Sequence, residues 1–183
     1  MFKSNFLKKC VLSFIVLHSY SLQITYAHEG HDHSHESVIT IGKKTYIHLQ
    51  SVFLAYQYIY GYVVKGETEG IAGPAQNIIN AAAQGIETEP EGAGQHMMEH
   101  ILEAAQNLKE AASVQQLQKA FTALDDALFP FFNSWPNQLI RNRLKICQCK
   151  NGHRWIQPEN TVTTCPYSQN KSSDCLIIVE TKY

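Results

Sequence analysis

The chain has 183 residues, a length that fits one domain with a small appendage and excludes two full hydrophobic cores. Hydrophobic residues make up 44% and charged residues 17%, a composition that excludes a wholly disordered protein. The formal net charge of −1 shows no excess of basic over acidic residues, so nucleic acid is not an expected partner.

The first 27 residues have the three-part pattern of a secretory signal peptide. Residues 1–9 carry three lysines and no acid. Residues 10–22 are apolar, but the run is too short and too often interrupted by serine to span a membrane. Thr25 and Ala27 place small residues before a cleavage point. We therefore expect residues 1–27 to be removed on export, leaving a periplasmic or secreted chain that does not span the membrane.

The mature N-terminus is predicted to begin with a polar, flexible tract over residues 28–42. Within its first eight residues it carries four imidazoles, those of His28, His31, His33 and His35. Neutral imidazole is a good ligand for Cu(II), Zn(II) and Ni(II), and the new α-amine at His28 could join it as a chelate. The tract therefore predicts metal binding. The alternative is a merely solvated start to the mature chain.

Residues 43–136 are predicted to form an antiparallel bundle of four helices joined by short links. The apolar and aromatic residues of 46–64 favour a buried helix, which Gly66 can end. A second helix should start near Gly73-Pro74 and end at Gly85, followed by a loop over 86–94.

The third and fourth helices show clear apolar periodicity. The third presents the stripe Met97, Ile101, Ala104, Ala105 and Leu108. Ser113 and Gln116 form a capping box that starts the fourth helix, and Pro130 can end or kink it. The apolar positions of that fourth helix are Leu117, Phe121, Leu124, Leu128 and Phe131.

Opposite the apolar stripe, the third helix carries a second set of candidate metal ligands. At about 100° per residue, four side chains share its polar face, those of His96, Glu99, His100 and Glu103. Two histidines one turn apart can bind one metal, with a glutamate adding oxygen. The alternative is a solvated face with ordinary pairs between neighbouring turns. Met97 and Met98 offer sulfur, but Met97 belongs to the apolar stripe, where methionine usually fills space.

The segment 96–100 also matches the His-x-x-Glu-His pattern of one class of zinc peptidases, in which the glutamate activates water. Three fixed residues are a weak signal, and this chain is too small for the two-domain frame of those enzymes. We therefore expect no catalytic activity.

The tail over residues 137–183 holds all the cysteines of the mature chain, and Asn151-Gly152 with flanking β-branched runs predicts a small hairpin sheet. An even number of cysteines in an exported chain favours two disulfides, whereas two pairs on hairpins resemble a structural zinc ribbon. Adjacent-but-one cysteines are poorly placed to bridge each other, since a bridge needs a specific Cβ geometry. The residues concerned are Cys147, Cys149, Cys165 and Cys175.

Three stretches carry a family resemblance: residues 56–66, 96–105 and 118–128, together with the cysteine-bearing tail. They resemble a small helical domain of exported bacterial proteins, which also occurs at the C-terminal end of periplasmic adaptor subunits of copper and silver efflux systems. The resemblance covers about residues 46–168, and members of the family often carry histidine and methionine where residues 96–98 and 100 stand, which favours this face of the helix as a site. The family's Cys-Pro pair usually follows the helices directly, whereas here Cys147 and Cys149 occupy that place, so no tail ligand is carried over.

The sequence thus predicts a mainly α protein, an antiparallel four-helix bundle with a small cysteine-rich β appendage. Its expected function is that of a periplasmic metal-binding accessory protein for copper, zinc or a similar cation, with a periplasmic efflux component as a possible partner. The alternative is an envelope interaction module that docks a partner through its helices, with incidental histidines.

Overall fold

The structure, a computed structural model, describes residues 39–133, 142–149, 152–167 and 177–179. All of them belong to one compact unit that spans residues 34–183. The signal peptide and the histidine tract predicted over residues 1–35 lie outside the described residues, as does Cys175.

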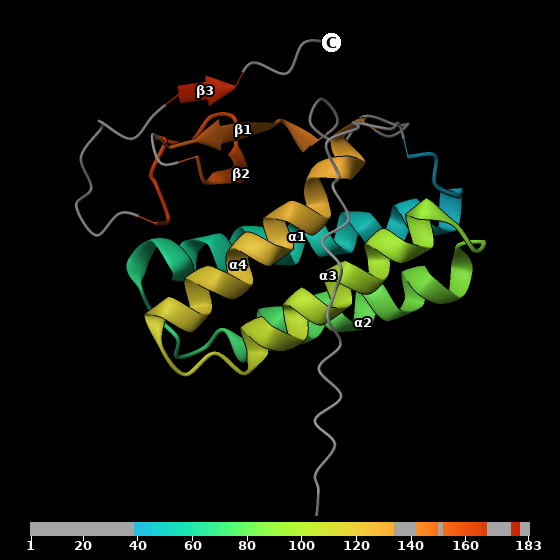
Figure 1. Cartoon of the computed structure of the whole chain (residues 1–183), viewed down its shortest axis with the longest axis horizontal. Helices are drawn as coiled ribbons and strands as arrows, with labels where there is room; N and C mark the ends of the chain where they lie inside the picture. Colours follow the sequence, from blue (N-terminus) through green and yellow to red (C-terminus); the bar gives the residue numbers. More distant parts are fainter. Residues whose placement is uncertain (1–38, 134–141, 150–151, 168–176, 180–183) are drawn as a thin grey trace, which may run out of the picture. The chain divides into compact units, whose positions relative to one another are not determined.

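The described part of the chain is mainly helical, as predicted (Figure 1). Each helix packs against the next one along the chain, and α1 also contacts α4. A short 3-10 helix follows α4 at the position of Pro130, where the ring removes a backbone donor and ends the α-helix. The helices are α1 (Lys43–Lys65), α2 (Ala72–Thr88), α3 (Ala93–Lys109), α4 (Val114–Leu128) and the 3-10 helix η1 (Phe129–Asn133).

Two predicted helix ends are confirmed. Gly66 ends α1 in the left-handed conformation at φ 69°, and its N–H donates to the carbonyl of Val63 at 3.0 Å. Ser113 caps α4 by accepting from the N–H of Gln116 at 3.3 Å. The Gln116 side chain accepts in return from the N–H of Ala112, one residue before the position in a standard capping box.

The predicted end of the second helix at Gly85 is wrong, because α2 continues to Thr88. Gly85 is buried inside the helix, and a Cβ atom there would lie 3.4 Å from Cγ and 3.5 Å from Sδ of Met98. This glycine therefore permits close packing of α2 on α3 and does not terminate α2. Consequently the predicted loop over 86–94 is shorter, and α3 already begins at Ala93.

Helix α1 is less buried than its composition predicts. Val52, Phe53, Tyr56, Ile59 and Val63 are in the core, as expected. Ile47 and Leu54, however, are 57% and 61% exposed. The helix is apolar on more of its circumference than the neighbouring elements cover.

The small sheet predicted for the tail is present. Strand β1 (Leu144–Gln148) pairs antiparallel with β2 (Arg154–Pro158), with Cys147 opposite Trp155. A third strand, β3 (Ile177–Val179), lies antiparallel on the other side of β1. At the turn, Gly152 has φ 90° and donates its N–H to the carbonyl of Cys149 at 2.9 Å. The predicted partner in this turn, Asn151, lies outside the described residues.

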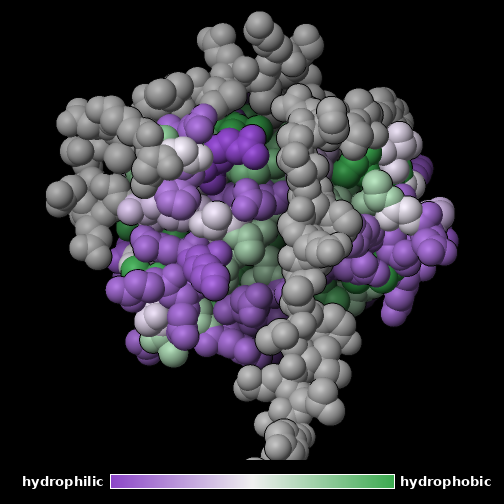
Figure 2. Space-filling model, in the orientation of Figure 1, coloured by the Kyte–Doolittle hydropathy of each residue, from purple (hydrophilic) through white to green (hydrophobic). Residues whose placement is uncertain are grey.

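Hydrophilic side chains cover much of the face over α3 and α4, with small apolar areas between them (Figure 2). Across the described ranges, no helix combines the length and apolar character needed to cross a membrane.

Candidate metal site

The predicted histidine pair comes together on the exposed side of α3. His96 Nε2 and His100 Nε2 lie 3.0 Å apart, and the two ring centroids are separated by 4.3 Å. Both residues are partly buried, and the side chain of His96 is 45% exposed. The one-turn spacing of the helix alone makes this contact possible, because residues four apart are neighbours on its surface. At this distance one ring N–H donates to the other ring nitrogen, so a metal ion could bind both nitrogens only by displacing that proton.

The two predicted glutamates differ in their relation to this pair. Glu99 Oε2 lies 3.5 Å from His96 Nδ1, the ring nitrogen on the other side from the contact with His100. A carboxylate in this place holds the ring and leaves Nε2 as the metal-facing nitrogen. Glu103 is exposed one turn further along α3. Glu99 thus contacts the ring of His96, whereas Glu103 adds a second carboxylate to the same face of the helix.

The methionines on α3 are core residues. Met97 is 5% exposed, as its place in the apolar stripe predicts, and Met98 is fully buried against Gly85 of α2. Met98 therefore fills space between α2 and α3, as methionine usually does in a core. Neither methionine lies on the exposed face of α3.

Helix α3 supplies only part of a coordination sphere. Among the described residues, no group of three or more histidine, cysteine, aspartate or glutamate side chains is arranged to hold a metal ion. A metal on His96 and His100 would therefore need water, or ligands from outside the described residues, to complete its shell.

Two cysteines of the tail are buried in the sheet. Cys147 in β1 is fully buried, and burial raises the pKa of its thiol to about 11. Cys149, at the end of the same strand, is 3% exposed, and its N–H donates to the carbonyl of His153 at 2.9 Å. Cys165 is partly buried against the core. Since Cys175 lies outside the described residues, disulfides and zinc both stay open predictions for the tail.

We expect the four cysteines of the mature chain to act as two pairs. Mass spectrometry of the unreduced protein should give a mass about 4 Da below that of the reduced form if two disulfides are present. Four thiols together with one bound zinc ion would identify the ribbon instead. A protein with four reactive thiols and no metal would contradict both pairings.

A buried polar network that sequence reasoning missed fixes the tail to the helices. Asp125 of α4 is fully buried, and its two carboxylate oxygens accept from the hydroxyls of Tyr56 at 2.6 Å and Tyr167 at 3.1 Å. The Tyr56 hydroxyl also accepts from the backbone N–H of Ile156 in β2 at 3.0 Å. Thr122 donates to the Tyr167 hydroxyl at 3.2 Å. One carboxylate thus links α1, α4, β2 and the segment that follows β2.

A second set of hydrogen bonds extends this attachment. Tyr60 of α1 donates to the carbonyl of Thr164 at 2.8 Å. Gln157 of β2 is fully buried and accepts from the indole N–H of Trp155 at 3.0 Å. Gln118 of α4 donates to the carbonyl of Pro166 at 3.0 Å. The tail is therefore attached to two helices and is part of the same core.

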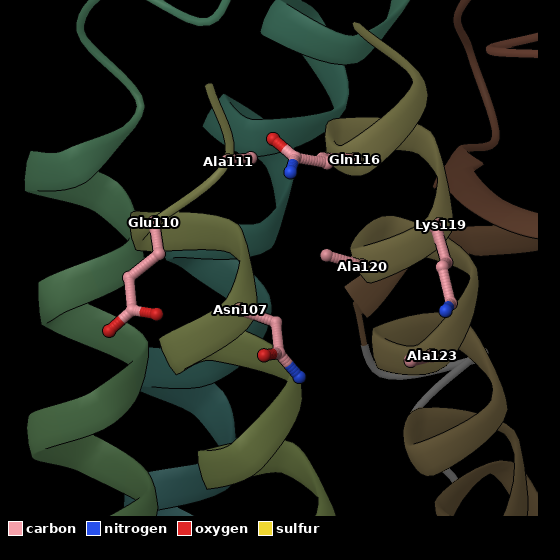
Figure 3. Close-up of a pocket in the computed structure, with 7 residues that line it drawn as sticks. All are labelled: Asn107, Glu110, Ala111, Gln116, Lys119, Ala120 and Ala123. Atoms are coloured by element: carbon pink, nitrogen blue, oxygen red, sulfur yellow. The ribbon is translucent and has the colours of Figure 1, made fainter. Parts of the chain in front are cut away.

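A pocket of about 310 Å³ lies between α3 and α4, near the end of α3 that is remote from His96 (Figure 3). Glu110 and Lys119 stand on opposite walls, and Ala120 and Ala123 line the side formed by α4. Its lining contains neither histidine nor cysteine, so it is not part of the metal site.

No protein-family model, no curated protein and no solved structure matches this sequence. The function of the site must therefore be inferred from its residues and their geometry.

Proposed function

We propose that this chain is a metal-binding accessory protein of the periplasm or the extracellular space, without catalytic activity of its own. It captures copper or a similar cation and passes it to an efflux or homeostasis partner. The observation that carries the proposal is the 3.0 Å separation of His96 Nε2 and His100 Nε2 on the outer side of α3. The four histidines between residues 28 and 35 support it independently.

The two imidazoles do not by themselves choose one metal, since neutral imidazole binds Cu(II), Ni(II) and Zn(II). The 3.0 Å separation of the two Nε2 atoms is that of a hydrogen bond between the rings, so a metal ion would replace the proton between them.

An incomplete ligand set suits transfer better than permanent structural binding. A structural site is closed by four protein ligands, whereas His96 and His100 offer two and leave positions open for exchange. The helix already holds His96 and His100 close together, so metal binding there needs to fix the conformation of few further residues. Binding to the predicted tract must order each residue it uses, at about 1–2 kcal/mol per residue. We therefore expect two separate sites with different affinities.

The helices and the tail would act in this function as a rigid support. We infer that the four helices form an antiparallel bundle, since links of four to six residues join them and each packs on its successor. The cysteine-rich tail would be an appendage that closes one side of this bundle through Asp125, Tyr56 and Tyr167.

The alternative function is an envelope interaction module in which the histidines are incidental. The exposed apolar residues of α1 favour a docking role, but such a role is compatible with metal transfer. Metal binding itself separates the two functions, because an interaction module needs none.

The experiment is a calorimetric titration of the mature protein with Cu(II) and Zn(II) at about pH 7.5 and about pH 5.5. The double variant His96→Ala/His100→Ala should lose the helix site, and His31→Ala/His33→Ala should weaken the tract. Binding should fall at the lower pH, because only neutral imidazole binds the metal. His48→Ala, a histidine of α1 outside both groups, is the matched control and should bind like wild type.

Two results would count against the proposal. If the helix double variant binds like wild type under every condition, the α3 face is merely solvated and only the tract is left. If neither double variant changes binding, metal capture is not the function of this protein.

A further inference from the structure

Helix α1 carries a line of large apolar side chains on its exposed side. Ile47, Leu54 and Tyr58 are 57%, 61% and 63% exposed. At 100° per residue they lie within about 40° of one another around the helix axis. Exposed apolar residues are common on protein surfaces, but here three of them align along one helix. Their alignment produces a narrow apolar line along α1.

Two small residues share this line with the large ones. Ser51 and Gly61 fall within about 40° of Ile47 around the axis, so the positions 47, 51, 54, 58 and 61 alternate in steps of four and three. Within the described part of the chain, no atom lies within 4 Å of the point that a Cβ of Gly61 would occupy. Alternating steps of four and three are the spacing with which one helix packs on another. The line therefore has the periodicity of a helix–helix contact.

The charges of α1 are all of one sign. Lys43 and Lys44 begin the helix and Lys65 ends it, and the helix contains no carboxylate. Lys65 is partly offset by Glu67 at 3.8 Å. The two N-terminal lysines add to the positive end of the helix dipole. Glu89 accepts from the N–H of Gly42 at 3.0 Å and offsets part of this charge. The apolar line thus runs from an end with two lysines and one carboxylate to a nearly neutral end.

We propose that this face of α1 docks a helix of a partner protein, with apolar residues at the same alternating spacing and carboxylates at the end that meets Lys43 and Lys44. A second copy of this chain fits less well, because the carboxylates beside the ends of α1, those of Glu67 and Glu89, already contact Lys65 and the N–H of Gly42. A membrane surface also fits less well, since membrane-surface helices present a broad apolar face and this one is a single line. The docking is independent of metal, so its failure would leave the proposed function intact.

The test uses two synthetic helical peptides of about three heptads, both with leucine at the contact positions. One carries glutamate in its terminal turns and the other lysine. Fluorescence anisotropy of the labelled peptides, with the mature protein in chelator, should give tighter binding for the glutamate peptide. Leu54→Glu should weaken that binding by at least about tenfold. The matched control is Val162→Glu, an 88% exposed apolar residue of the tail, which should stay within about twofold of wild type.

Charge reversal supplies the second readout. Lys43→Glu/Lys44→Glu should remove the preference for the glutamate peptide or reverse it. Circular dichroism of each variant checks that the helices are intact. No binding of either peptide to wild type would overturn the proposal. Self-association of the protein without peptide binding would also overturn the proposal if Leu54→Glu abolishes that self-association. Binding to anionic phospholipid vesicles without peptide binding would overturn it in the same way if Leu54→Glu abolishes the vesicle binding.

Discussion

Replacing Tyr56 by alanine should lower the free energy of unfolding by about 3–5 kcal/mol. The ring is 1% exposed and stacks on Phe121 of α4 at 5.3 Å between centroids. Its hydroxyl bonds to Asp125 and to the backbone of Ile156. The substitution leaves a large cavity and two buried polar groups without their partner, so both losses act together. Urea unfolding followed by circular dichroism measures the change.

Two further variants separate these losses. Tyr56→Phe keeps the ring and removes only the hydroxyl, so it should cost about 1–3 kcal/mol. Tyr58→Ala, two residues further along the same helix, removes a ring that is 63% exposed and should cost much less than Tyr56→Ala. Equal destabilisation by Tyr56→Ala and Tyr58→Ala would show that the buried network does not hold the tail to the helices.

Asp125 should make the stability of the protein fall as the pH rises. Burial raises the pKa of this carboxyl well above its usual range, and nearby Asp126 adds to the shift, against the hydrogen bonds from Tyr56 and Tyr167. A raised pKa means that the folded state favours the neutral acid. The stabilisation is therefore complete below the unfolded pKa near 4, and it is lost as the pH rises through the folded pKa.

The measurement is the urea midpoint at intervals between about pH 4 and about pH 9. Asp125→Asn mimics the neutral acid and cannot ionise, so its midpoint should depend less on pH than that of wild type. Asp126→Asn changes the exposed neighbour in α4 and should keep most of the wild-type pH dependence. Parallel curves for wild type and Asp125→Asn would contradict the assignment of this pH dependence to Asp125.

Local sequence signals predicted the helices and the histidine pair well. The ends at Gly66 and Ser113 depend on residues within one turn, and the contact between His96 and His100 follows from helical spacing alone. Gly85 misled the prediction because its role depends on Met98 of another helix. The exposure of Ile47 and Leu54 could not be predicted from the sequence either, because apolar composition does not reveal which neighbouring elements cover a helix face.

The sequence contains a hint of the network around Asp125 but does not identify its members. Asp125 lies four residues after Phe121, within the apolar stripe of α4, and a carboxylate in such a stripe signals a buried polar contact. Its partners lie 69 and 42 residues away in the chain, at Tyr56 and Tyr167. Contacts over such separations depend on the tertiary packing of the tail, which no local pattern encodes.

If His96 and His100 bind a transferable metal ion, the protein should retain that ion when it is purified from its native envelope without chelator. Elemental analysis of the wild-type protein and of the His96→Ala/His100→Ala variant, purified in the same way, measures the bound metal. We predict copper in the wild-type protein and a clear loss of that copper in the variant. Wild-type protein with no more copper, zinc or nickel than an unrelated exported protein would contradict the claim.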